Sequence, residues 1–292
     1  MKYEFVRNHP KYPVTKWAAL LKVSTSAYYD WLGSKDERDR RVQKYVTAIK
    51  ELFEKSENTY GVDRICGCLR KRGYTASYKR VSRIMYELGL VSIHRRRRQH
   101  SLTDSRDSRG RELPNLIQGL NITEPFQVIT SDISYVRTAE GFEYLCAVKD
   151  VVSGIVLAQT MSDNMKADLV ARTIKKAKKR WNLPAGCIHH SDRGSQYTAE
   201  LVVKLLKDYN ILQSFSRVGK PGDNAWSESY FANLKKEAVH WRHFRTREEA
   251  RLAIFAYTEG FYNTRRVQKR LDYLSPIEWL NHYNEMVLKG VA

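Results

Sequence analysis

The stretch Phe126-Gln-Val-Ile-Thr-Ser-Asp-Ile-Ser-Tyr-Val136 decides the fold of this 292-residue chain. Valine, isoleucine and aromatic residues are frequent in it, which is typical of a β-strand. Asp132 interrupts the apolar surroundings of Ile129 and Ile133, where a charged residue is unexpected. The sequence therefore predicts a strand that carries one conspicuous carboxylate.

Downstream of this strand, strand-like and helical segments alternate. Two further strand-like runs, at 142–150 and 154–160, each follow a turn that contains glycine, so three sequential antiparallel strands are expected. After them we expect a helix at 166–181, a strand at 187–190, a helix at 199–209 and a strand at 211–216. Two more helices are expected to begin near residues 223 and 247. This order predicts a mixed α/β sheet with helices on both faces, and it resembles the ribonuclease H-like fold.

The first hundred residues read as short helices separated by turns. Residues 17–21 and 25–32 predict two helices around a tight turn, with Ser24 as the N-cap of the second. Such a helix-turn-helix-like pair is a weak signal by itself, because many small helical hairpins share it. A longer helix is predicted over 40–55.

A second helix pair is predicted between Tyr60 and Leu88. Gly73 ends its first helix and Ser77 caps its second, in which apolar residues recur at helical spacing. The face opposite this apolar stripe carries the cations Lys79, Arg80 and Arg83. The arrangement is typical of a recognition helix that contacts DNA, although an ordinary basic surface helix is the alternative.

Positive charge is concentrated where the helical half ends. The chain has a net charge of +19, and residues 61–111 hold 14 Lys and Arg against 4 Asp and Glu. The densest cluster is the run Arg95, Arg96, Arg97 and Arg98. A polyanion partner explains this density better than a solvated basic surface does.

We therefore expect five parts in the chain: a short helical segment (1–38), a helix-turn-helix DNA-binding domain (39–98), a basic linker (99–123), an α/β catalytic core (124–240) and a helical extension of that core (241–292).

Three carboxylates can meet in such a core. Asp132 lies on the first strand, Asp192 follows the fourth, and Glu228 lies on a later helix that could pack across the same end of the sheet. Carboxylates brought together repel one another unless a cation stands between them, and Mg²⁺ prefers oxygen ligands. A pair of such ions could clamp the attacking and leaving oxygens of a phosphoryl transfer.

Helix geometry selects Glu228 over its neighbours. Asn224 and Lys235 fall close to its face of the helix, whereas Glu237 points about 180° away. We expect Lys235 to contact a DNA phosphate beside the metal site and Asp223 to cap the helix.

Two histidines precede Asp192. We expect His190 to support Asp192 from outside the ligand shell, with a purely structural role as the equal alternative. The role of His189 stays open, because no third imidazole stands at ligand spacing.

With these residues in place, the chain resembles the orfB-encoded transposases of the IS-three family of bacterial insertion sequences, within the retroviral-integrase-like (DDE) superfamily. The resemblance covers nearly the whole chain, and 35 residues separate Asp192 from Glu228. Its strongest motifs are Thr130-Ser-Asp-Ile-Ser-Tyr135, His190-Ser-Asp-Arg-Gly-Ser-Gln-Tyr197 and Asp223-Asn-Ala-Trp-Ser-Glu-Ser-Tyr-Phe231.

The resemblance implies magnesium-dependent transposition, with Mn²⁺ as a substitute ion. Cleavage at an element end frees a 3′ hydroxyl, which then attacks another DNA phosphate in the same site. The implied partners are double-stranded DNA of the terminal repeats and the target, further copies of the chain, and the upstream-frame orfA product. The chain would correspond to the second-frame portion of a frameshift fusion.

Two other functions stay open from the sequence. One is a DNA-binding regulator with an inactive integrase-like domain, and the other is a nuclease of the same fold. Cys66 and Cys68 lack the second pair of ligands that a structural zinc site needs. Without an apolar run of 18 residues or a signal peptide, we expect a cytoplasmic, nucleoid-associated bacterial protein.

Overall fold

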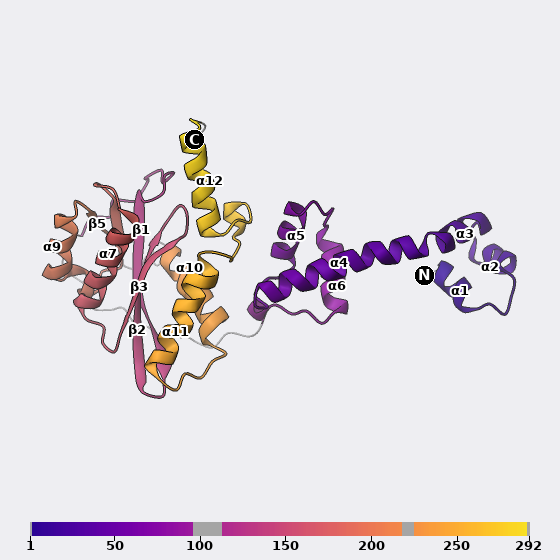
Figure 1. The fold of residues 1–292 in the computed structure, drawn as a ribbon, viewed down its shortest axis with the longest axis horizontal. Helices are drawn as coiled ribbons and strands as arrows, with labels where there is room; N and C mark the ends of the chain where they lie inside the picture. The colour runs from indigo at the N-terminus through magenta and orange to yellow at the C-terminus, as the bar shows by residue number, and fades with distance from the viewer. Residues whose placement is uncertain (1, 96–112, 218–224, 291–292) are drawn as a thin grey trace.

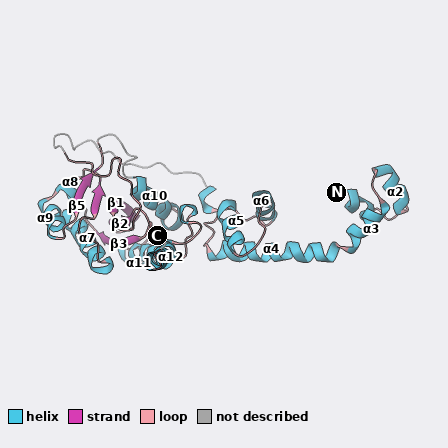
Figure 2. Cartoon of the chain, turned by 90° about the horizontal axis from the view of Figure 1, so that it is seen from above, coloured by secondary structure: helices cyan, strands magenta, loops and turns pink. Residues whose placement is uncertain are grey.

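The computed structural model describes residues 2–95, 113–217 and 225–290. Helices form the amino-terminal half, and a five-stranded sheet flanked by helices forms the rest (Figure 1, Figure 2). The α-helices are α1 (Lys2–Asn8), α2 (Val14–Leu21), α3 (Thr25–Gly33), α4 (Lys35–Lys55), α5 (Val62–Lys71), α6 (Tyr78–Glu87), α7 (Ala167–Trp181), α8 (Ser195–Thr198), α9 (Glu200–Asp208), α10 (Ala225–Leu234), α11 (Arg247–Tyr257) and α12 (Pro276–Leu288). The strands are β1 (Val128–Thr138), β2 (Gly141–Asp150), β3 (Val156–Ser162), β4 (Ile188–Ser191) and β5 (Leu212–Phe215).

The long helix α4 joins two helical units. Its carboxyl-terminal half buries Tyr45, Ile49 and Phe53 in a cluster shared with α5 and α6, whereas residues 36–44 are almost all exposed. Helices α1 to α3 lie at the far end of α4 from the sheet (Figure 1). The Ser24 hydroxyl accepts a hydrogen bond from the Ala27 N–H, so the predicted N-cap of α3 is confirmed.

The second helix pair, α5 and α6, has the predicted turn between its helices. Gly73 adopts φ +81°, a left-handed conformation that glycine tolerates, and the Ser77 hydroxyl accepts from the Arg80 N–H. Val81 and Ile84 are buried, which confirms the apolar stripe of α6. The predicted helix-turn-helix region is therefore present.

The sheet has the strand order β3-β2-β1-β4-β5. Strand β1 pairs antiparallel with β2 and parallel with β4, and β5 runs parallel to β4. The first and fourth strands are thus neighbours, which is the condition for Asp132 and Asp192 to lie near each other. This arrangement places β4 beside the first residues of β1, so the carboxyl-terminal end of β4 lies next to the middle of β1.

Each face of the sheet has its own hydrophobic cluster. Helices α7 and α9 cover one face, where Ile129, Leu157 and Ile174 are fully buried. Helices α10 and α11 cover the other face, where Val136 packs in the same cluster as Tyr230. Figure 1 shows these two helical layers on opposite sides of the strands.

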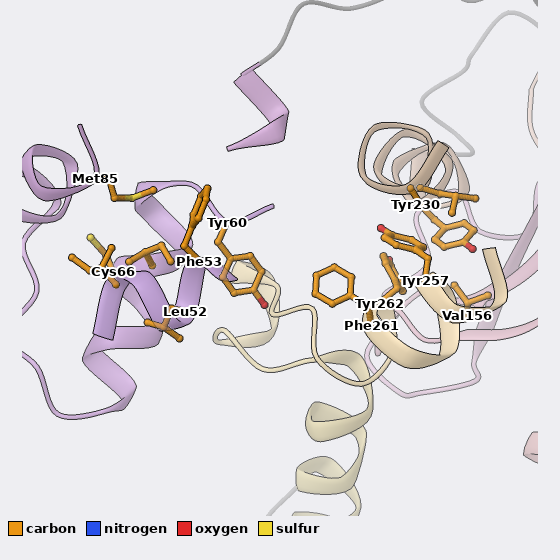
Figure 3. Close-up of a cluster of buried hydrophobic side chains, with 14 of the residues drawn as sticks. Leu52, Phe53, Tyr60, Cys66, Met85, Val156, Tyr230, Tyr257, Phe261 and Tyr262 are labelled. Atoms are coloured by element: carbon orange, nitrogen blue, oxygen red, sulfur yellow. The ribbon is translucent and has the colours of Figure 1, made fainter. Parts of the chain in front are cut away.

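The second cluster continues beyond the sheet into the helix-turn-helix region (Figure 3). Tyr60, at the start of that region, belongs to it together with Phe261 and Tyr262 of the carboxyl-terminal part. The Tyr60 hydroxyl also donates to the Arg265 carbonyl at 2.9 Å and accepts from the Val267 N–H at 2.8 Å. The two halves of the chain are therefore packed together, not merely tethered.

Several details differ from the sequence-based expectation. Helix α4 begins at Lys35, about five residues before the predicted start, because Ser34 allows the turn out of α3. Two π-helical turns, Lys235–Val239 and Thr258–Tyr262, continue α10 and α11. No helix in the described ranges is long and apolar enough to cross a membrane.

Candidate active site

Asp132 lies in the middle of β1, and Asp192 comes directly after the neighbouring strand β4. Thr130 of β1 pairs with His190 of β4, and each aspartate follows its paired residue by two positions. Since Ile129 packs beneath α7 and α9, the alternation of side chains along a strand turns Asp132 toward the face that α10 covers. The register of two strands thus brings both carboxylates beside α10.

The backbone holds one oxygen of each aspartate. Asp132 Oδ1 accepts from the Ile133 N–H at 2.8 Å, and Asp192 Oδ1 accepts from the Gly194 N–H at 3.0 Å. Between described residues, no hydrogen bond reaches the second oxygen of either side chain. Each carboxylate therefore keeps an oxygen that a ligand could use.

The pKa of Asp132 reflects its burial first and its charged neighbours second. Burial raises the pKa of Asp132 to about 7, and the negative charges of Asp192 and Glu228 add to the rise. The ammonium of Lys235 acts on the same carboxyl in the opposite sense. The charges of Asp192, Glu228 and Lys235 therefore act on Asp132, and the common site that the sequence predicts stays a prediction.

Glu228 stands exposed in the first turn of α10. A buried lysine supports this turn, because Lys149 Nζ donates to the Trp226 carbonyl at 3.0 Å. Lys149 lies on β2 opposite Thr130, and burial lowers its pKa. A buried ammonium group is costly unless it is hydrogen-bonded. The bond from Lys149 to the Trp226 carbonyl therefore fixes the start of α10 to the sheet.

Lys235 begins the π-helical turn at the other end of α10. Its Nζ lies 5.2 Å from the centre of the Tyr135 ring on β1, a cation–π contact. Glu237, two residues later, is completely buried away from Asp132 and pairs with Arg266 at 2.7 Å. Asn224 and Asp223 lie outside the described residues.

The donor set suits magnesium. Three carboxylates supply the hard oxygen ligands that Mg²⁺ prefers, and their mutual repulsion is what a divalent cation relieves. Among the described residues, no three His, Cys, Asp or Glu side chains already stand at ligand distances from a common point. The fit therefore rests on donor chemistry and on the convergence of like charges.

The two histidines of β4 point to different partners. His190 contacts the hydroxyls of Ser214 and Ser216 at 2.9 and 3.0 Å, and the Ser216 N–H donates to the Ser191 carbonyl. These contacts steady the backbone before Asp192, and the supporting role of His190 stays a prediction. His189 is buried against the Ser131 hydroxyl at 2.7 Å, and burial lowers its pKa to about 3, so it is neutral.

The predicted DNA-binding cations fall into two groups. Lys79, Arg80 and Arg83 are exposed on α6, on the side away from its buried stripe. The backbone of Arg95 belongs to the 3-10 turn Ile93–Arg95, and the remaining arginines of that run, Arg96, Arg97 and Arg98, lie outside the described residues.

Sequence reasoning missed two supports of the site. Lys149 follows the apolar run Leu145-Cys-Ala-Val148, where a charged residue was a usable signal. The second support is Glu237 with its buried partners. No sequence pattern indicates it, because those partners lie far from Glu237 in the chain.

Family models match both parts of the chain. The family described as "Integrase core domain" matches residues 122–221 and again 228–284, and "HTH-like domain" matches 39–98. The catalytic core of bovine immunodeficiency virus (BIV) integrase, at 18% identity and a TM-score of 0.42, covers 55% of this chain and 98% of its own.

Curated relatives match at higher identity. Transposase InsF for insertion sequence IS3A of Escherichia coli is 32% identical over 291 residues, which is 96% of this chain and 99% of that protein. The transposase for insertion sequence element IS904 of Lactococcus lactis is 37% identical over 229 residues, covering 78% and 90%. The chain thus belongs to the IS-three (IS3) family of insertion-sequence transposases, with a helix-turn-helix region and an integrase core.

Proposed function

We propose that this transposase binds the ends of an insertion sequence and catalyses DNA strand cleavage and strand transfer with Asp132, Asp192 and Glu228. The observation that carries the proposal is the setting of Asp132, whose burial first and whose negative neighbours Asp192 and Glu228 second raise its pKa to about 7. Acids so placed in a protein of net charge +19 suit a site for metal and phosphate better than a purely structural one.

The reaction is an in-line displacement at phosphorus. Cleavage joins a water oxygen to phosphorus and breaks the bond to the 3′ oxygen, which leaves as a hydroxyl. In strand transfer that 3′ oxygen joins a second phosphorus, whose own 3′ oxygen departs. Asp132, Asp192 and Glu228 would hold magnesium, as one or two ions and with manganese as a substitute, which would neutralise charge and lower the pKa of the attacking hydroxyl.

The protein's own groups bind and orient the DNA. Asp132 and Asp192 present their carboxylates from fixed strands, and Glu228 completes the set from α10. Lys235, beside Asp132, would contact a phosphate oxygen as a point charge. Lys79, Arg80 and Arg83, together with the arginine run from Arg95, would bind the duplex phosphates of the element ends.

Substitution of the carboxylates tests the chemistry. We expect Asp132→Asn, Asp192→Asn and Glu228→Gln each to lower magnesium-dependent end cleavage and joining by at least about a thousandfold, while end binding persists. Glu248→Gln, an exposed change on α11, is the matched control and should act like the wild type. Activity retained by all three variants would exclude this site and favour a DNA-binding regulator.

Substitution of the α6 cations tests the binding. We expect Arg80→Ala with Arg83→Ala to weaken end binding and to flatten its dependence on salt, by roughly 0.9 in log–log slope for each phosphate that the variant no longer neutralises. The matched double change Lys204→Ala with Lys207→Ala, on exposed positions of α9, should leave both quantities unchanged. Equal binding isotherms for the α6 variant would move recognition to another surface.

A further inference from the structure

Glu237 is the centre of a buried ionic network. Its side chain has no exposed surface, and Arg266 Nη2 donates to its Oε1 at 2.7 Å. The Tyr257 hydroxyl donates to Oε2 at 2.8 Å, and His94 Nε2 lies 2.6 Å from Oε1. Burial by itself would raise the pKa of Glu237, but these partners outweigh it and lower the pKa to about 2, so the group is a carboxylate.

The partners of Glu237 come from separate parts of the chain. Tyr257 ends α11, Arg266 follows the second π-helical turn, and His94 lies in a 3-10 turn near the end of the helix-turn-helix region. Tyr60 of the helix-turn-helix region also binds the segment around Arg266, because its hydroxyl forms hydrogen bonds with Arg265 and Val267. Glu237 is therefore a point where the helix-turn-helix region meets the integrase core.

Glu237 also belongs to the same helical segment as the site residues of α10. Lys235 precedes it by two positions in one π-helical turn, and Glu228 lies on the helix that this turn continues. Single π-turns inside helices are rare and recur at functional sites. A shift of Glu237 along or around this turn would move Lys235 relative to Asp132.

The energetics of the network favour a role in geometry over one in stability. A buried ion pair gains little over well-packed apolar side chains, because removing both charges from water offsets their attraction. Its hydrogen bonds are directional, however, so they admit one orientation of the groups that share them. The network specifies how the two halves dock and where the end of α10 lies.

We propose, resting on the function proposed above, that Glu237 is a positioning residue through which the docked helix-turn-helix region fixes Lys235 and Glu228 for strand cleavage. Substituting Glu237 itself would leave Arg266 charged and unpaired in the core, and the chain could fail to fold. The test therefore uses the partners on the DNA-binding side, His94 and Tyr60.

The test compares His94→Ala and Tyr60→Phe with two matched controls in the full chain, His282→Ala and Tyr29→Phe. Both control side chains are exposed, on α12 and α3. We expect the first two variants to bind element ends with unchanged Kd and KM, but to cleave with a kcat lowered about tenfold or more, since small displacements of positioned groups slow catalysis strongly. Backbone amides of residues 230–235 should exchange hydrogen faster in both, and the controls should match the wild type.

The two measurements separate this inference from the function on which it rests. Wild-type kcat with wild-type exchange in His94→Ala and Tyr60→Phe would overturn the inference. A lowered melting temperature with unchanged kcat and unchanged exchange at 230–235 would overturn it too, because it describes mere stability. A wild-type chain that cleaves no element ends with magnesium would instead refute the proposed function, and hydrogen exchange would still decide whether docking holds α10.

Discussion

Two of the three carboxylates stand on the sheet, and the third stands on a helix. Asp132 and Asp192 are placed by the parallel pairing of β1 with β4, which is a ladder of backbone hydrogen bonds. Glu228 is placed by the packing of α10, whose ends are held by side chains. Most side-chain substitutions leave the backbone hydrogen bonds between strands intact, whereas a single substitution can remove a support that a side chain provides.

The supports of α10 lie at its two ends. Lys149 holds the first turn through the Trp226 carbonyl, and Glu237 holds the π-helical turn through Arg266. Between these ends, the Tyr230 hydroxyl lies 2.8 Å from that of Thr258. The helix-borne part of the site is therefore the part that depends on distant residues, and the following changes should disturb it while the sheet stays intact.

The largest expected effect follows Glu237→Gln. The change leaves the Arg266 guanidinium buried without a counter-charge, so we expect a loss of about 3 to 5 kcal/mol in the free energy of unfolding, measured by urea denaturation. Replacing both partners, as in Glu237→Gln with Arg266→Met, should recover much of that loss. If the single variant matched the wild type in stability, the network would carry no structural weight.

The second largest effect is expected at low pH, where protonation of Glu237 should weaken the same network. The pKa of Glu237 is about 2 in the folded chain, below its ordinary value of 4.5, so its contribution to stability is complete above pH 4.5. It should fade as the pH falls from about 4.5 to about 2, by at most about 3 kcal/mol.

The measurement is the difference in unfolding free energy between wild type and Glu237→Gln at several pH values. That difference should shrink toward pH 2, because the glutamine variant has no such titration. A difference that stays constant between pH 6 and pH 3 would contradict the assigned charge state.

A smaller effect is expected at Gly67, where α5 approaches the carboxyl-terminal part. A Cβ at this position would overlap the Tyr273 ring, so Gly67→Ala should cost about 1 to 3 kcal/mol of stability through overpacking. Gly33→Ala, at the open end of α3, meets no atom and should be neutral. Thermal unfolding of both variants measures this difference in stability. Equal melting temperatures would mean that the Tyr273 ring moves aside without a loss of stability.

The smallest expected effect follows Lys149→Met. The variant loses one hydrogen bond to the Trp226 carbonyl but also removes a buried charge, so its stability should change little. We expect end cleavage to slow by about tenfold, because the start of α10 is less well fixed near Glu228. Lys175→Met, on the exposed face of α7, is the control, and full activity of Lys149→Met would show that packing alone holds the helix.

The sheet-borne half of the site was predictable from local sequence. An aspartate among β-branched residues and a second one just past a short strand suffice once the first and fourth strands are neighbours, and the structure supplies that pairing. Side-chain alternation around Ile129 even indicates the face on which Asp132 lies. These inferences need only period and topology.

The helix-borne half was predictable only in part. Helical spacing correctly separates Glu237 from Glu228, but it assumes a continuous α-helix and does not reveal the π-helical turn at Lys235–Val239. It also cannot reveal that Glu237 meets His94 and Arg266, because contacts between residues so distant in sequence depend on tertiary packing. The contacts of His190 with two serines of the neighbouring strand region are unreadable for the same reason.

The length of α4 has a consequence for the amino-terminal helices. Twenty-one residues in one helix span about 31 Å, and each residue added or removed turns the far end by about 100°. Since residues 39–44 are exposed, an insertion there would leave the helix-turn-helix packing and the contact of Arg38 with Trp31 unchanged, but it would rotate α1 to α3 around the helix axis. Only an insertion or deletion of about seven residues, or two turns, would restore the original orientation of α1 to α3. The number of residues in α4 therefore determines the direction that these three helices face.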